Sequence, residues 1–212
     1  MREKKLDKRK VQGAETKKKL YEIAEKLFSE HDFDTVGVED ITDAAGITKG
    51  AFYVHFSSKD ELIALLIADY VTQADTDYKT FLKTLPDDMH VSEVLLALTQ
   101  KIADTLLNTI GCENMKKVYQ MLLAGTVDTD AVKGYSRELY TLFHGVLAKG
   151  IQHGEITSSL PLETLSRHFV IAIRGVSYEW CVRHPNFDLK AQAVEHIQML
   201  LGAICFHTNK NV

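Results

Sequence analysis

Very few prolines interrupt this chain of 212 residues. The three that occur, at positions 86, 161 and 185, fall where an apolar periodicity stops or starts, so no periodic segment is broken by one. Apolar side chains recur at steps of three and four through most of the remaining sequence, which is the spacing of a helix with one buried face. We therefore expect an all-α fold.

Long apolar runs are also absent. The stretch from Leu62 to Ala68 is among the longest, far short of the roughly 20 residues that cross a bilayer. The basic start, MREKKLDKRK, is followed by VQGAETKKKL rather than by an apolar segment, which excludes the pattern of a secretory signal. We expect a cytoplasmic protein that makes no membrane contact.

Cysteine is scarce, with three residues, Cys112, Cys181 and Cys205, far apart in the chain. An odd number without a spacing pattern argues against a disulfide framework and suits a reducing compartment. Buried free thiols are the expected state. Cys181 and His184 stand one helical turn apart, but two ligands do not make a metal site, so we expect no metal and no other cofactor.

Positive charge is unevenly distributed. The net charge is −4, yet residues 1–19 hold nine Lys or Arg against three acids, for +6, and the remainder holds 16 against 26, for −10. The distribution suggests an anion-binding end on an acidic body. A basic tail that only keeps the protein in solution is the other interpretation, and charge by itself leaves both open.

Four helices are expected in the first third of the chain. The first spans about residues 16–31, and the second spans 38–45 and ends at Gly46, which can adopt a positive φ. Thr48 is a suitable N-cap for a third helix over 49–56, and the Ser58-x-x-Glu61 pair is a capping box for a fourth helix from about residue 59. Further helices are expected near residues 91–110, 114–125, 131–153, 161–184 and 189–208.

The second and third helices form a recognisable unit. Phe52 and Phe56 share the inward face of the third helix, which leaves Lys49, Tyr53 and Val54 pointing outward. Two short helices joined by a glycine-containing turn are typical of the helix-turn-helix, whose second helix lies in the DNA major groove. The small residues Gly50 and Ala51 would let the start of this helix approach base edges.

At this point the sequence resembles the TetR family of bacterial regulators. From about Ala14 to Leu62 it follows the N-terminal signature of that family nearly position by position, through LFSEHDFDTVGVEDITDAAGITKGAFYVHFSSKDEL. The most specific parts are the Tyr53-x-His55-Phe56 run and the run from Lys59 to Leu62. The rest of the chain matches the family only in length and layout.

The resemblance implies a homodimer of all-α subunits that binds a double-stranded DNA operator. It implies a basic arm with a three-helix DNA-binding head over residues 1–57, and a helical body for ligand binding and dimerisation over 58–212. By similarity, Lys49, Gly50, Ala51 and Val54 face bases, and Thr48, Tyr53, His55 and Lys59 face phosphates. Gly37 departs from the family pattern of Ser or Thr, so no side-chain contact is assigned there.

The body is expected to hold a small, largely apolar effector that releases a repressor from its operator. Side chains that could line its cavity are Tyr70, Met115, Tyr119, Met121, Phe143 and Trp180, although for any one of them the simpler interpretation is that it fills the core. The helix from residue 59 would carry the signal to the head. A regulator that answers to a protein partner, or a constitutive repressor, remains an alternative.

Two other classes fit less well. For an enzyme, the chain has no Walker sequence and no GxGxxG, and GVSYE at Gly175 lacks the closing glycine of a nucleophile elbow. A purely architectural DNA binder would not need about 150 further residues after its head. Those residues end in two strongly patterned segments, and we expect their apolar seams to form a four-helix dimer interface. The seam residues are Leu162, Leu165, Phe169, Ile173, Val176 and Trp180, then Ala193, Ile197, Leu200 and Ile204.

Overall fold

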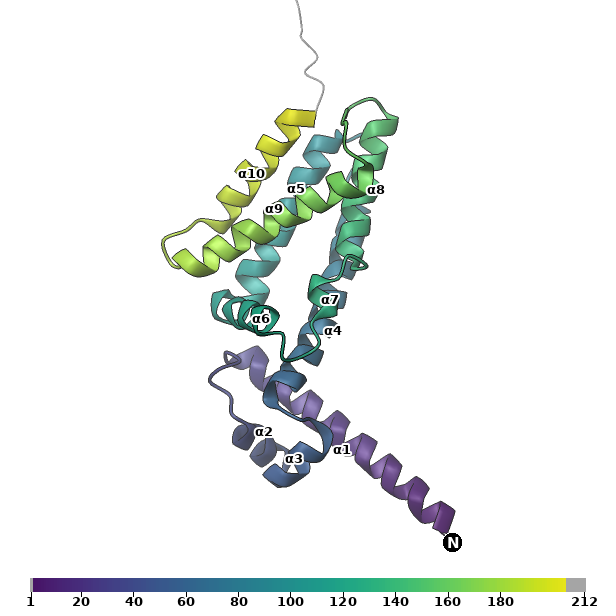
Figure 1. The fold of residues 1–212 in the computed structure, drawn as a ribbon, viewed down its shortest axis with the longest axis vertical. Helices are drawn as coiled ribbons and strands as arrows, with labels where there is room; N and C mark the ends of the chain where they lie inside the picture. The colour runs from purple at the N-terminus through teal and green to yellow at the C-terminus, as the bar shows by residue number, and fades with distance from the viewer. Residues whose placement is uncertain (1, 205–212) are drawn as a thin grey trace, which may run out of the picture. The chain divides into compact units, whose positions relative to one another are not determined.

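A computed structural model describes the backbone of residues 2–204 and the side chains of residues 10–204. Within this range every regular element is a helix, which confirms the all-α prediction (Figure 1). The elements are α1 (Arg2–Glu30), α2 (Val38–Ala45), α3 (Lys49–His55), α4 (Lys59–Leu82), α5 (Val91–Thr105), η1 (Leu106–Ile110), α6 (Cys112–Ala124), α7 (Asp130–Lys133), α8 (Glu138–Gln152), α9 (Leu162–Arg183) and α10 (Leu189–Ile204).

The chain divides into two compact units. One unit, here called the head unit, comprises Met1–Tyr70 and Lys117–Asp130, and the other, the body unit, comprises Val71–Lys116 and Ala131–Val212. The helices α4 and α6 each contribute residues to both units. The expected division at residues 57 and 58 concerns which residues bind DNA, and it stays a prediction.

In the head unit, α1, α2 and α3 pack around a small apolar core. Leu20, Ala24 and Phe28 of α1 are buried, and Ile41 of α2 and Phe52 of α3 are fully enclosed. These positions repeat at three and four residues, so each helix presents one stripe to the core. The predicted bounds of α2 and the start of α3 at Lys49 are confirmed.

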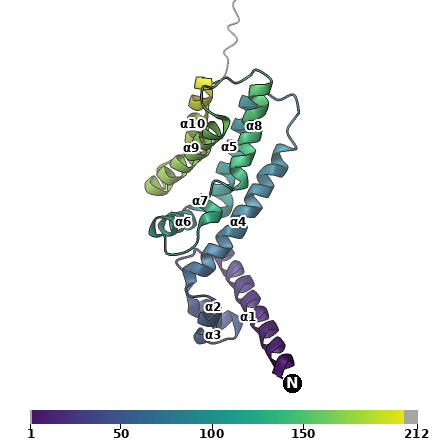
Figure 2. The same cartoon turned by 45° about the vertical axis from the view of Figure 1, so that its right-hand side comes forward.

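The helix α1 is longer than the sequence pattern predicted. Its apolar stripe begins at Leu20, but the helix itself begins at Arg2. Apolar periodicity detects only the part of a helix that packs against something, so a helical turn without a buried face gives no such signal. The basic residues before the stripe therefore belong to a helix rather than to a tail of unknown conformation (Figure 2).

Two local predictions at helix ends are confirmed, one of them in part. Gly46 ends α2 with φ 63° and ψ 37°, in the left-handed region. Ser58 Oγ accepts a hydrogen bond from the Glu61 amide at 3.0 Å, which is one half of the predicted capping box. The Glu61 carboxylate instead accepts from the amide and the hydroxyl of Ser57, both at 2.6 Å, so it reaches one residue further back.

The body unit has its core between α5, α8, α9 and α10. In both views α10 lies beside α9, and contacts between helices also join α10 to α5 and α8 to α9 (Figure 1, Figure 2). Its fully buried side chains include Leu95, Leu98, Phe143, Leu147 and Ile197. The second half of α4 adds Tyr78 to the same core.

Two expectations about the body unit are corrected. The segment 131–153 is not one helix, because α7 ends at Lys133 and α8 begins at Glu138. The seams of the last two helices are not free for a partner chain, because most of their residues, including Ile173 and Ile197, are buried within the subunit. The strongest apolar stripe of a helix is the one that packs into the core of its own subunit. The strong patterns of the last two helices therefore indicated the core and not the dimer interface.

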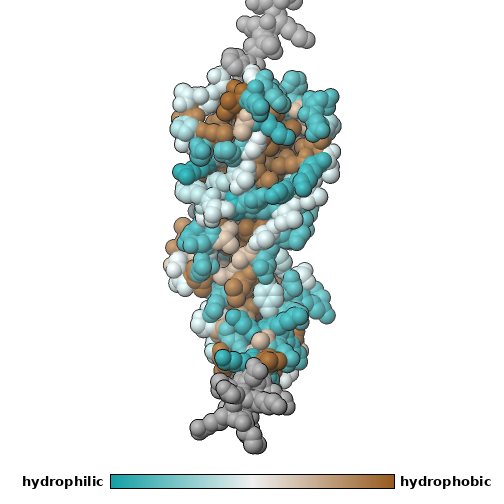
Figure 3. All heavy atoms as spheres, turned by 90° about the vertical axis from the view of Figure 1, so that its right-hand side faces the viewer, coloured by the Kyte–Doolittle hydropathy of each residue, from teal (hydrophilic) through white to brown (hydrophobic). Residues whose placement is uncertain are grey.

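The surface mixes polar and apolar side chains. On the face drawn in Figure 3, apolar side chains form separate patches between hydrophilic ones. Among the residues that the structure describes, no helix is both long and apolar enough to cross a membrane.

Candidate nucleic-acid interface

The helix α3 is held by its ends and by one buried face. Thr48 accepts a hydrogen bond from the Ala51 amide at 3.3 Å and so caps the helix, as predicted. Phe52 and Phe56 are 0% and 1% exposed, and their ring centroids lie 5.5 Å apart. An element of seven residues has little stability of its own, so this anchoring is what fixes its direction.

The opposite face of α3 lies at the surface. Val54 is 79% exposed and Tyr53 is 50% exposed. Thr48, Lys49 and Gly50 are exposed as well, and Ala51 and His55 are half-buried. The predicted outward residues are thus available to a ligand, and their division into base-facing and phosphate-facing groups stays a prediction.

Lys49 already has an anionic partner. Its Nζ lies 2.9 Å from Glu39 Oε1 on α2, and this hydrogen bond raises the pKa of Lys49 above its ordinary value. Both side chains are more than half exposed, so the pair is held in water. Exchange of Glu39 for a base edge or a phosphate would cost little.

Lys59 has a role that sequence patterns did not indicate. Its Nζ donates to the carbonyl oxygens of Phe33 and Val36, at 2.9 and 3.0 Å. An ammonium group has three protons, so one remains for a phosphate. Lys59 therefore ties the start of α4 to the loop between α1 and α2, whatever else it binds.

Gly37 precedes α2 in an extended conformation, and its amide donates to Asp40 Oδ2 at 2.6 Å. The Asp40 carboxylate thus accepts a hydrogen bond from the amide of the residue that precedes the helix, which is one half of a capping box. Glycine offers no hydroxyl, in agreement with the absence of a predicted side-chain contact at this position.

Lys117 of α6 belongs to the same unit and was not predicted. Its Nζ lies 3.2 Å from Asp60 Oδ1 and 3.5 Å from Asp34 Oδ1, and its side chain is 15% exposed. Burial would lower the pKa of Lys117, but the two carboxylates together outweigh that effect and raise it. The partners are more than 50 residues away in sequence, so no local signal could have revealed the contact.

The candidate effector residues are divided between the two units. Tyr70, Tyr119 and Met121 belong to the head unit, and Met115, Phe143 and Trp180 belong to the body unit. Phe143 lies in the body core, where its ring centroid is 6.0 Å from that of Phe169. Met121 and Trp180 are buried, each 3% exposed, whereas Tyr70 lies at the surface. Their part in ligand binding stays a prediction.

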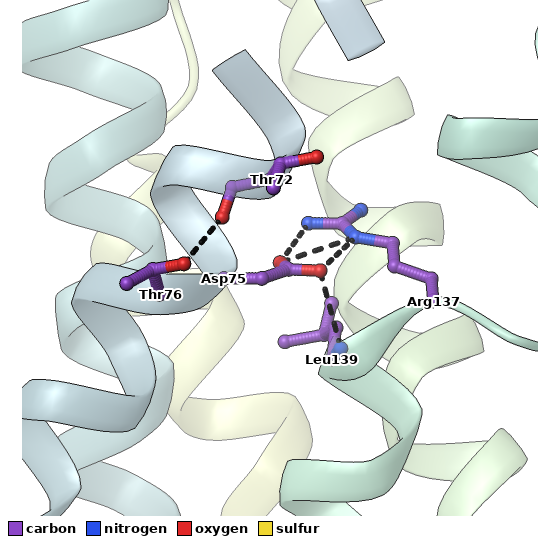
Figure 4. Close-up of polar contacts among 5 residues, drawn as sticks. All are labelled: Thr72, Asp75, Thr76, Arg137 and Leu139. Atoms are coloured by element: carbon purple, nitrogen blue, oxygen red, sulfur yellow. Dashed lines mark hydrogen bonds and ion pairs between the residues drawn. The ribbon is translucent and has the colours of Figure 1, made fainter. Parts of the chain in front are cut away.

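A buried ion pair was missed by sequence reasoning. Asp75 of α4, 3% exposed, accepts two hydrogen bonds from Arg137 Nε and one from Nη2, and a further one from the Leu139 amide (Figure 4). These hydrogen bonds hold the start of α8 against α4 within the body unit. A charge this deep is stable only because its partner satisfies both carboxylate oxygens.

In the core of the body unit, one hydroxyl has no partner among the described residues. Tyr140 is 7% exposed, and its Oη makes no hydrogen bond within the described part of the chain. An unsatisfied buried hydroxyl costs about 1–3 kcal/mol. Such a hydroxyl is a candidate for contact with a polar group of a bound molecule.

The two described cysteines are free, buried thiols, as expected, and Cys205 lies outside the described residues. Burial raises the pKa of Cys181 to about 12, and the side chain of Cys112 is in hydrogen-bond contact with it. His184 ends α9 and is exposed. In residues 10–204 no three His, Cys, Asp or Glu side chains come together as metal ligands.

The head unit thus has the geometry of a helix-turn-helix DNA-binding protein, with a short helix anchored on one face and open on the other. Comparison with known proteins agrees. Residues 20–66 match the family model described as bacterial regulatory proteins, tetR family. The HTH-type transcriptional regulator AcrR of Shigella flexneri is 26% identical over 207 residues, which cover 92% of this chain and 91% of AcrR.

Solved structures share the fold along most of the chain. A TetR-family regulator from Pectobacterium atrosepticum superposes with a TM-score of 0.74 at 19% identity, covering 93% of this chain and 97% of its own. Thermus thermophilus FadR, a TetR-family repressor in complex with lauroyl-CoA, gives 0.68 at 17% identity, with 92% and 98% covered. Residues 20–66 therefore match the DNA-binding domain of the tetR family, and the chain as a whole is similar in sequence and fold to TetR-family transcriptional regulators.

Proposed function

We propose that the protein is a repressor that binds a duplex operator of two inverted half-sites. The observation that carries this proposal is the open face of α3, where Lys49, Gly50 and Val54 are exposed while Phe52 and Phe56 are enclosed. In a helix-turn-helix this face enters the major groove. Lys49, Gly50, Ala51 and Val54 would read base edges, and Thr48, Tyr53, His55 and Lys59 would hold phosphates.

One recognition helix of seven residues makes too few base contacts for tight binding, so we infer that a homodimer presents two. The seam expected from sequence is buried within the subunit, but α9 carries a second apolar stripe. Ile171 and Val182 are 51% and 60% exposed, and they lie on the same side of the helix as Gly175 and Tyr178. This stripe is our candidate for the dimer face.

We infer further that a small, largely apolar molecule binds the body unit and lowers operator affinity. FadR of Thermus thermophilus, which has this fold, was solved with lauroyl-CoA. In the present chain the apolar core around Phe143 and the unpartnered Tyr140 hydroxyl favour a ligand with a long apolar part and one polar group. A protein partner in place of a small molecule remains the alternative.

Operator binding is tested by selecting duplexes from a random pool with the purified protein, followed by footprinting of the selected sequence. We expect two inverted half-sites, with centres about 34–36 Å or a little more apart along the duplex. Protection of a single half-site by a monomer would contradict the dimeric arrangement, and failure to enrich any sequence would contradict operator binding.

A further inference from the structure

The first ten residues of α1 whose side chains are described pack against very little. None of residues 10–19 is buried, and the first enclosed side chain is Leu20. A helix that is polar all round does not form in order to build a core. The helical segment over residues 2–19, here called the basic arm, is therefore a candidate for contact with something outside the subunit.

The basic arm leaves the head beside the C-terminal end of α3. A Cβ atom added at Gly13 would lie 3.9 Å from His55 Cε1, and Lys17 Nζ lies 5.2 Å from the ring centroid of Phe56. These distances place one turn of α1 next to His55, which is among the residues proposed to hold phosphates. Beyond Gly13 the helix continues to Arg2.

The charge of the basic arm is complementary to a polyanion. Residues 2–12 hold six Lys or Arg against two acids, in a chain whose net charge is −4. At a rise of about 1.5 Å per residue, this segment is roughly 16 Å long. Duplex DNA presents one phosphate charge for about every 1.7 Å of its axis, so a segment of this length can pass several phosphates.

We propose that residues 2–19 of α1 form a second DNA-contacting element, which binds the phosphates of the duplex that flanks the base pairs read by α3. The inference rests on the proposed function of the head, and it adds a partner surface that α3 does not supply. Because the basic arm binds phosphates, it increases affinity for every sequence and extends the footprint without altering base preference.

The test compares two triple variants with equal loss of charge. In the arm variant Lys5, Lys8 and Lys10 become Gln, and in the control Lys83, Lys101 and Lys149 of the body unit become Gln. Affinity is measured against salt concentration for the selected operator and for an unrelated duplex. We expect the arm variant to reduce the steepness of the log–log salt plot by about 0.9 for each phosphate that it no longer neutralises, and to weaken both duplexes alike.

The outcomes separate the inference from the function on which it rests. If wild type selects no operator, the proposed function itself fails. If the arm variant shows the same salt dependence of binding as wild type and the control, the basic arm does not contact DNA. Shortening the duplex to the base pairs covered by α3 should also abolish the difference between the arm variant and wild type.

Substitution of Gly13 tests whether the arm acts as a helix. Proline at this position removes a helical hydrogen bond and breaks the helix, whereas alanine raises helix propensity by about 1 kcal/mol and has room for its methyl group. With charge unchanged, G13P should lose most of the affinity that the arm variant loses, and G13A should bind at least as tightly as wild type. Wild-type binding by G13P would overturn the helical element.

Discussion

At the scale of single residues, Glu39 and DNA compete for the ammonium group of Lys49. In the proposed function Lys49 turns to DNA and away from a carboxylate 2.9 Å from its Nζ, and that carboxylate would lie near the bound DNA. We expect Glu39→Gln to tighten binding to the selected operator by up to about fivefold, since an exposed pair is worth at most about 1 kcal/mol.

The matched control for this prediction is Glu30→Gln at the end of α1, which changes net charge equally without touching Lys49. Fluorescence anisotropy at one fixed salt concentration measures both variants. Equal tightening by the two would mean that net charge, rather than the release of Lys49, is responsible.

The role of a single residue could be predicted when the group that it contacts lies close to it in the sequence. Thr48 as N-cap, Gly46 in the left-handed region and the enclosed Phe52 were all predicted, because their partners lie within a few residues. Lys59 was interpreted only as a phosphate contact, because the carbonyl groups that it binds belong to a loop 23 to 26 residues earlier.

At the scale of elements, Lys117 ties α6 to the start of α4 and to the loop between α1 and α2, all within the head unit. We expect Lys117→Met to lower the free energy of unfolding by about 1–2 kcal/mol, because it leaves Asp34 and Asp60 without their shared cation while keeping the aliphatic stem. Thermal unfolding measures the loss, and hydrogen exchange should rise in the loop that contains Asp34.

Lys116→Met is the control, because Lys116 pairs with Glu113 within α6 and is more exposed. A similar loss of stability in both variants would mean that general charge on α6, and not the ion pairs of Lys117 with Asp34 and Asp60, is what matters. If hydrogen exchange rose only in α6 itself, these ion pairs would likewise be unimportant.

Element boundaries were predicted well where a buried stripe or a cap marks them. The helices α2, α4 and α9 begin within a residue or so of their expected starts, at Val38, Lys59 and Leu162. The extension of α1 to Arg2 and the break between α7 and α8 were missed. In the first case the added turns have no buried face that would mark them as helical, and in the second no proline marks the gap between the two helices.

At the scale of the whole molecule, assembly depends on which apolar stripe faces a partner. We expect Ile171→Asp combined with Val182→Asp to yield a folded monomer in sedimentation velocity, because both side chains are exposed in the subunit. Operator affinity should fall with it, since each half-site would then be bound independently.

Two further variants serve as controls for the double substitution. Leu123→Asp, at a position 79% exposed on α6, should leave the dimer intact. Ile173→Asp, at a position on α9 that is only 6% exposed, should unfold the body unit instead of separating subunits. A dimer that survives the double substitution would place the interface elsewhere.

The effector was the least predictable part of the molecule. Its candidate residues were chosen by type, as aromatic and Met side chains, and they are divided between the two units. The more informative feature, a buried hydroxyl on Tyr140 without a partner, depends on packing among helices far apart in sequence. No periodic pattern encodes a missing hydrogen bond.

The ion pair between Asp75 and Arg137 also constrains how this protein can evolve. Loss of either residue alone would strand the other charge in the core, at a cost of about 3–5 kcal/mol, while replacement of both by apolar side chains could be neutral. A single substitution at either position is therefore strongly destabilising, and we expect the two residues to be replaced together or not at all. Across relatives that keep this packing of α4 on α8, positions 75 and 137 should consequently covary.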